Sequence, residues 1–233
     1  AVAQAQVQSD VQLHTLLYVE DNPANLMLVE DLIARRPDIR LLTAREARHG
    51  IQIARTARPQ VILMDINLPG ISGIPAMKLL LKHGADPNIR TAKVPERYEE
   101  GGPDPSLPDQ SGLAPIPWHG PAVAPIHAAS GVGYGLGFAG NTHRHVPEGW
   151  VPAVKFLVEE LGADVNARDH NGYTPVHHAA ARGDVDLIRY LVSKGADVTA
   201  IGRTGQTTVD MANGPVQRVQ PYPETIKFLE SLG

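Results

Sequence analysis

The sequence predicts a chain of two unlike parts, a small parallel α/β segment followed by an array of helical repeats. Two observations lead to this fold class. Short apolar runs alternate with amphipathic helical patterns up to residue 73, and a glycine-containing motif then occurs three times, the last two copies 33 residues apart. Glycine and proline, at 22 and 20 of 233 residues, are concentrated between residues 101 and 150, where we expect loops inserted into the repeats.

The composition excludes several classes of protein. The net charge is −4 and no long basic run occurs, so we expect no nucleic-acid partner. No apolar run approaches the roughly 20 residues of a membrane-spanning helix, so we expect no membrane partner. The lack of cysteine excludes disulfides, thiolate metal sites and cysteine nucleophiles. We favour a cytoplasmic over a periplasmic location, while Ala1 in first place leaves open that a leader was removed.

Three short apolar strands are predicted in the first part, at residues 14–19, 39–43 and 61–64, after an N-terminal extension of residues 1–13. A helical pattern fills each gap between them, and the first helix has Asn22 as N-cap and Pro23 in its first turn. Continuous apolar strands that alternate with helices are typical of a parallel sheet covered on both faces.

Three carboxylates directly follow the first and third strands: Glu20, Asp21 and Asp65. Because the carboxyl ends of parallel strands meet at one edge of a sheet, we expect these side chains to converge. Converging carboxylates repel one another unless a cation offsets their charge, and Mg²⁺ prefers oxygen ligands of this kind. The alternative is that Asp21 caps a helix and Asp65 begins a loop.

The runs LLYVEDN at residues 16–22 and VILMDINLPGISG at residues 61–73 resemble the receiver domain of bacterial response regulators, a flavodoxin-like α/β fold. The resemblance implies that Asp65 is a phospho-acceptor, that Glu20 and Asp21 help to hold Mg²⁺, and that the backbone carbonyl of Asn67 is a further ligand. A complete receiver has two more strands, which end in Ser or Thr and in Lys, and no such pattern follows Gly73. We therefore expect a half-receiver over residues 14–73, degraded as a signalling device.

A repeated motif occupies the second part, residues 74–233. KLLLKHGADPN at residues 78–88 recurs as KFLVEELGADVN at 155–166 and RYLVSKGADVT at 189–199, and Gly162 and Gly195 are 33 residues apart. Together with NGYTPVHHAA at residues 171–180, these runs resemble ankyrin repeats. The resemblance implies a helical solenoid in which a helix begins at Thr174-Pro175 and His177 bonds groups between repeats. The helix at 74–83 would complete a first, partial unit, and it also lies where the third helix of a receiver would begin.

The repeat spacing places insertions near residues 90–122 and 131–148. The first insertion is rich in proline and acidic residues. The second is rich in glycine, and Tyr134, Phe138 and Trp150 lie in it or just after it, so we expect a binding loop there. Histidines in and near these insertions could form a transition-metal site, namely His143 and His145 with His127 or His119. Against this metal site, His127 occupies an ankyrin structural position.

We favour a non-catalytic protein-interaction function for this chimera of a degraded receiver and a short ankyrin array, since no nucleotide-binding or serine-hydrolase motif occurs. One alternative is a signalling protein that responds to phosphorylation or Mg²⁺ through Asp65. Another is a metal-dependent enzyme that uses the histidine-bearing loop. In a sheet of order 2-1-3 the third strand lies at an edge without lysine or proline. Either the ankyrin segment or its insertions fold back over this edge, or two chains pair through it, and we favour the homodimer. The sequence does not distinguish a natural from an engineered fusion.

Overall fold

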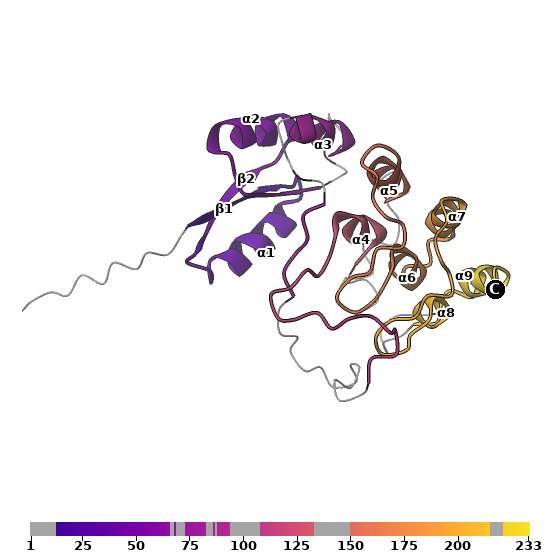
Figure 1. The fold of residues 1–233 in the computed structure, drawn as a ribbon. Helices are drawn as coiled ribbons and strands as arrows, with labels where there is room; N and C mark the ends of the chain where they lie inside the picture. The colour runs from indigo at the N-terminus through magenta and orange to yellow at the C-terminus, as the bar shows by residue number, and fades with distance from the viewer. Residues whose placement is uncertain are drawn as a thin grey trace, which may run out of the picture. The chain divides into compact units, whose positions relative to one another are not determined.

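The computed structural model describes residues 13–65, 68, 73–82, 86, 88–93, 108–132, 150–214 and 221–233. The chain divides into two compact units, residues 1–85 and 86–233 (Figure 1). We expected the ankyrin part to start at residue 74, and the helix at that point belongs to the first unit.

The first unit is a three-stranded parallel sheet with the predicted order β2-β1-β3. Its elements alternate along the chain: β1 (His14–Val19), α1 (Pro23–Ile33), β2 (Ile39–Ala44), α2 (Ala47–Ala57), β3 (Val61–Met64) and α3 (Gly73–Lys82). Leu17 of β1 pairs with Leu42 on one side and with Ile62 on the other. Helix α1 covers one face of the sheet, and α2 and α3 lie on the opposite face (Figure 1). The predicted half-receiver fold is confirmed.

Local signals in the sequence determine where these helices begin and end. The Asn22 side chain accepts a hydrogen bond from the Ala24 amide at 2.9 Å, and Pro23 occupies the first turn of α1, as predicted. Helix α2 is capped at its C-terminus by Arg58, whose backbone is left-handed with a φ of 45°. This turn leads the chain into β3.

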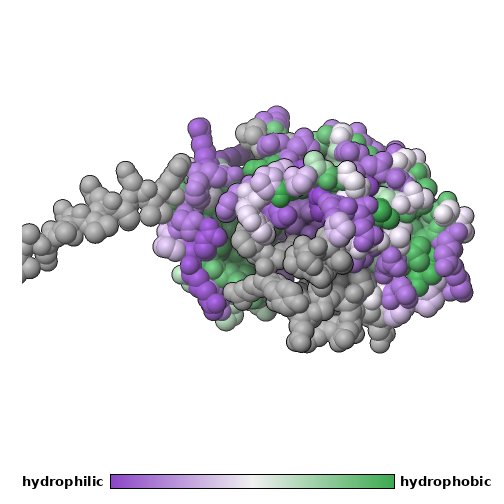
Figure 2. All heavy atoms as spheres, turned by 60° about the horizontal axis from the view of Figure 1, so that its bottom comes forward, coloured by the Kyte–Doolittle hydropathy of each residue, from purple (hydrophilic) through white to green (hydrophobic). Residues whose placement is uncertain are grey.

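Alternating residues of the strands give the sheet one well-covered and one less covered face. Leu17 and Val19 are fully buried on the α2 face, where Ile62 and Met64 also pack. On β3 the alternate residues Val61 and Leu63 are 48% and 49% exposed. The first unit also carries exposed hydrophobic side chains on α1, namely Met27, Leu28 and Leu32. In Figure 2 hydrophobic and hydrophilic residues are interspersed over the coloured surface of the molecule. The sheet therefore retains uncovered apolar surface on the side of α1.

The second unit consists of stacked helix pairs. The pairs are α4 (Pro125–Ser130) with α5 (Trp150–Glu159), α6 (Pro175–Ala181) with α7 (Val185–Ser193), and α8 (Thr208–Ala212) with α9 (Pro223–Glu230). Helices α4, α6 and α8 pack in one row, and α5, α7 and α9 form a second row beside it (Figure 1). This two-layered stack confirms the predicted ankyrin solenoid. None of the helices in the described residues is long and apolar enough to cross a membrane.

Part of the first insertion is a short hairpin that precedes α4. Ala92 and Pro121 form an antiparallel bridge, the Thr91 amide donates to the Val123 carbonyl at 3.0 Å, and the Lys93 amide donates to Gly120 at 2.7 Å. Several residues singled out from the sequence lie outside the described residues: Asn67, Tyr134, Phe138, His143 and His145. Trp150 is the first residue of α5, but its side chain also lies outside the described part.

Candidate functional site

An acidic cluster forms at the carboxyl edge of the sheet in the first unit. Glu20, Asp21 and Asp65 each offer one carboxylate oxygen, and these oxygens lie within 4.8 Å of one another. The Asp65 amide donates to the Val19 carbonyl at 2.9 Å, which holds the ends of β1 and β3 together. The structure thus brings together the three carboxylates that the sequence places after the strands.

Glu20 is the most buried member of the cluster, with 6% of its surface exposed. Its Oε2 accepts a hydrogen bond from the Tyr18 hydroxyl at 2.8 Å, and its Oε1 accepts one from the Asn22 amide at 3.1 Å. Burial, the hydrogen bond to Glu20 and the charges of Glu20 and Asp65 raise the pKa of Tyr18 far above its usual value. Tyr18 therefore stays protonated and orients the Glu20 carboxylate.

The donor set of this cluster fits a hard divalent cation. All three side chains supply oxygen, and Asp21 and Asp65 are partly exposed, so both can be reached by a hydrated ion. Arg45 donates to the backbone carbonyl of Asp21 at 3.2 Å, which places one positive charge at the border of the cluster. A Mg²⁺ ion bound here would offset the mutual repulsion of the carboxylates.

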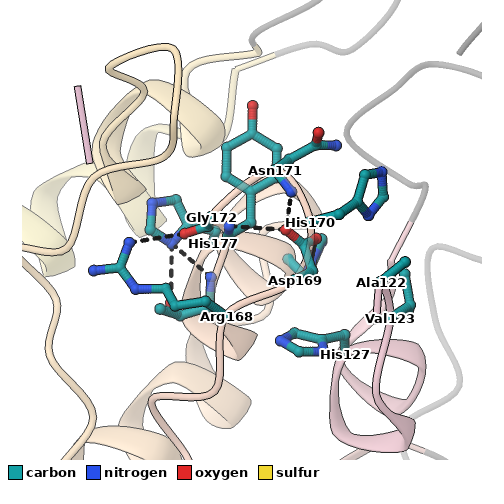
Figure 3. A network of polar contacts seen from close by, with 12 residues as sticks. Ala122, Val123, His127, Arg168, Asp169, His170, Asn171, Gly172 and His177 are labelled. Carbon is teal, nitrogen blue, oxygen red and sulfur yellow. Dashed lines mark hydrogen bonds and ion pairs between the residues drawn. The ribbon is translucent and has the colours of Figure 1, made fainter. Parts of the chain in front are cut away.

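A second polar cluster lies buried inside the ankyrin array and centres on Asp169, which is 1% exposed (Figure 3). Its Oδ1 accepts from the amides of Asn171 at 2.8 Å and Tyr173 at 2.9 Å, and its Oδ2 contacts His178 Nε2 at 3.0 Å. Burial opposes ionisation, yet the hydrogen bond and charge of His178 keep the pKa of Asp169 below its usual value. Nothing in the sequence singles out His178, whose buried ring is hydrogen-bonded to this carboxylate.

Two histidines at equivalent positions connect successive repeats. His127 Nδ1 accepts from the Ala124 amide at 3.0 Å, and its Nε2 lies 2.9 Å from the Ala167 carbonyl. His177 Nδ1 accepts from the Thr174 amide at 3.1 Å, and its Nε2 lies 3.3 Å from the Gln206 carbonyl. The bonds of His177 are those that the ankyrin resemblance implies.

Burial lowers the pKa of both of these histidines to about 4, so their rings are neutral at pH 7. Both ring nitrogens of His127 already have hydrogen-bond partners. A metal ion at His127, as in the histidine-site alternative, would have to displace one of these bonds. His119 lies in the hairpin before α4, with a left-handed backbone at a φ of 64°.

Arginines hold the loops of the array in place by binding backbone carbonyl groups. Arg168 donates to the carbonyls of Gly172 at 2.9 Å and Ile201 at 2.6 Å, and Arg90 donates to the Arg168 carbonyl at 2.8 Å. Arg203 donates to the carbonyls of His170 and Ala114, both at 2.9 Å. None of these arginines stands out in the sequence, because each acts on backbone groups that any residue would offer.

Comparison with protein families assigns both parts of the chain. Residues 16–93 match the response regulator receiver domain, and residues 143–192 and 177–220 match ankyrin repeats. Each of these matches covers about a third of the chain. They agree with the receiver-like and ankyrin-like motifs quoted above.

Among individual proteins, similarity is found with protein phosphatase 1 regulatory subunit 12A of Mus musculus, 44% identical over 96 residues, which are 40% of this chain and 9% of that protein. Protein phosphatase 1 regulatory subunit 27 of Mus musculus is 42% identical over 69 residues, 30% of this chain and 44% of that protein. A protein-glutamate methylesterase/protein-glutamine glutaminase of Desulfitobacterium hafniense is 34% identical over 76 residues, 32% of this chain and 19% of that protein.

The chain spans less than half the length of each of these relatives. The similarity therefore covers only the aligned part of each relative, and the activity of the whole relative is not carried over to this chain. Fold, motifs and family matches agree on the two parts of the molecule. The chain combines a response-regulator receiver segment with a C-terminal array of ankyrin repeats.

Proposed function

We propose that the protein is a non-catalytic interaction module whose ankyrin array binds a protein partner. The observation that supports this best is the exposure of Trp118. This residue is 57% exposed, although most large apolar side chains of the array are buried. Exposed aromatic side chains on a well-ordered support are the kind of residue that contributes most to protein interfaces. Two relatives are named as regulatory subunits of a protein phosphatase, which also supports a role in protein binding.

In the hairpin before α4 a lysine lies over the Trp118 ring, and backbone hydrogen bonds order the turn that carries it. Lys93 Nζ lies 5.1 Å from the centre of the indole ring and donates to the Ile116 carbonyl at 3.3 Å. The His119 amide donates to the Lys93 carbonyl at 2.8 Å, and the Gly120 amide donates to the Pro117 carbonyl at 2.9 Å. Because the turn is already ordered, this protein would lose little conformational entropy when a partner covers Trp118.

Affinity capture from the source lysate, with the full chain as bait, tests this proposal. We expect Trp118→Ala to weaken capture of the partner by about tenfold or more, the usual effect of removing a tryptophan anchor. Leu28→Ala is the matched control, because Leu28 is 60% exposed on α1 of the other unit and should leave capture unchanged. Equal capture by wild type and Trp118→Ala would contradict this assignment of the binding surface.

The acidic cluster supports a second candidate function, a response to Mg²⁺ or to phosphorylation at Asp65. The convergence of three carboxylates within 4.8 Å is the observation that favours it. Calorimetric titration with Mg²⁺ should show weaker binding for Asp65→Asn, since one anionic ligand is lost, and unchanged binding for Asp31→Asn on the exposed side of α1. Because the sequence lacks the Ser or Thr and Lys pattern of a receiver, acetyl phosphate should give little stable phospho-protein. Efficient Mg²⁺-dependent labelling of Asp65 would instead establish the signalling function.

A further inference from the structure

The strand β3 presents an unpaired edge and an apolar face in the described part of the first unit. It pairs with β1 alone, so the backbone groups on its other side are available to a further strand. The strand carries no charged residue, and Val61 and Leu63 on one face are 48% and 49% exposed. An occupant of this edge must supply both backbone hydrogen bonds and apolar side chains, which a peptide strand does.

The pattern of exposed residues on β3 is self-complementary. A two-fold axis perpendicular to the sheet at Ile62 would pair two copies of β3 in antiparallel orientation. In that register Val61 of each copy lies opposite Leu63 of the other, on the same face of a continuous sheet. Both exposed side chains then gain a cross-strand apolar neighbour, and the combined sheet has six strands instead of three.

The charges that flank β3 are complementary in the same register. Arg58, three residues before the strand, has an exposed side chain, and Asp65 follows the strand within the acidic cluster. Antiparallel pairing about Ile62 brings the Arg58 end of one strand beside the Asp65 end of the other. Each copy would therefore add a guanidinium group to the border of the other copy's acidic cluster, where three carboxylates converge.

We infer that β3 is the dimerisation edge of this protein and that its occupant is β3 of a second copy. Strand pairing, apolar contact between residues 61 and 63, and the placement of Arg58 all favour the same symmetric arrangement. The arrangement does not depend on the partner of the ankyrin repeats. It makes the acidic cluster a site to which both copies contribute.

The mass of the full chain in solution, measured by light scattering over a dilution series, tests this inference. We expect about twice the chain mass of 25.0 kDa at micromolar concentration, falling towards 25.0 kDa on dilution. Leu63→Lys should yield a folded monomer, because it places charge at the paired edge. Leu32→Lys is the control, since Leu32 is 57% exposed on α1 and away from the edge.

A second pair of variants tests the contribution of Arg58. Arg58→Glu should raise the dissociation constant of the dimer by about tenfold at low salt, whereas Arg55→Glu, an exposed change in the last turn of α2, should not. A mass of 25.0 kDa that does not change with concentration would overturn the inference and show that the edge is covered within one chain. Equal loss of dimer in Leu63→Lys and Leu32→Lys would overturn the assignment to β3.

Discussion

Acidification should destabilise the ankyrin array through its two buried histidines. His127 and His177 are fully buried, and their folded-state pKa of about 4 lies below the unfolded value of 6.5. Between these values the unfolded chain binds more protons than the folded chain, so the free energy of unfolding decreases as the pH falls from 6.5 to 4. Each histidine contributes about 1.4 kcal/mol per pH unit within this range.

The two contributions together amount to a loss of about 4 kcal/mol at pH 5 relative to pH 7.5, a large share of the stability of a small unit. Asp169 adds little in this window. Its pKa is lowered by folding, so its stabilising effect is lost below the unfolded value of 3.8. A loss of stability that begins near pH 6.5 is therefore assigned to the histidines.

Urea denaturation followed by tryptophan fluorescence measures this effect in the correct unit, because both tryptophans, Trp118 and Trp150, lie in the second unit. The single variants His127→Asn and His177→Asn should each halve the pH dependence between 7.5 and 5, whatever they do to stability at pH 7.5. His119→Asn changes a histidine outside the buried cluster and serves as the control. An unchanged pH dependence in both single variants would refute the reasoning.

Two further predictions concern packing in the same unit. Leu191→Ala should lower the free energy of unfolding by about 2–5 kcal/mol, because Leu191 is fully buried. The control Leu232→Ala, at a residue 37% exposed, should lower it by less than about 1 kcal/mol. Equal losses of stability would contradict the repeat boundaries. Gly183→Ala should cost several times more than Gly195→Ala in the same urea assay: both glycines have positive φ, but a Cβ at Gly183 would collide with the Tyr222 ring and one at Gly195 meets nothing within 4 Å. Similar losses of stability would mean that backbone strain alone determines the effect of both substitutions.

Much of the α/β segment could be predicted because its signals are local. The strand at residues 14–19, the cap formed by Asn22 and Pro23, and the order of the strands all follow from short apolar runs and from the residues between them. The convergence of Glu20, Asp21 and Asp65 follows from parallel topology, since equivalent strand ends meet at one edge. The hydrogen bond from Tyr18 to Glu20 was not predicted. A spacing of two residues along a strand indicates only that both side chains lie on the same face, and not that they bond.

The ankyrin repeats could be predicted where their motif is repeated. His177, for example, makes the bonds that its position in the motif implies. His127 makes the same bonds one repeat earlier, within the shorter run APIHAA. The buried pair of Asp169 and His178 repeats less clearly in the sequence. Asp169 is stabilised by two amides of its own turn as well as by His178, so the contact with His178 depends on backbone geometry that the residue types do not specify.

The part of the first insertion that precedes α4 shows most clearly what sequence reasoning lacks. Asp109 falls in a proline-rich run that is typical of a surface loop, and a surface loop predicts a small effect of its replacement. In the structure Asp109 pairs with Arg203, 94 residues later, and the Gln110 amide donates to the Arg203 carbonyl at 2.8 Å. Arg203 has 16% of its side chain exposed and also binds Ala114 and His170. The loop is therefore attached to the last repeats through one arginine, and a contact over such a distance has no periodic or local signal in the chain.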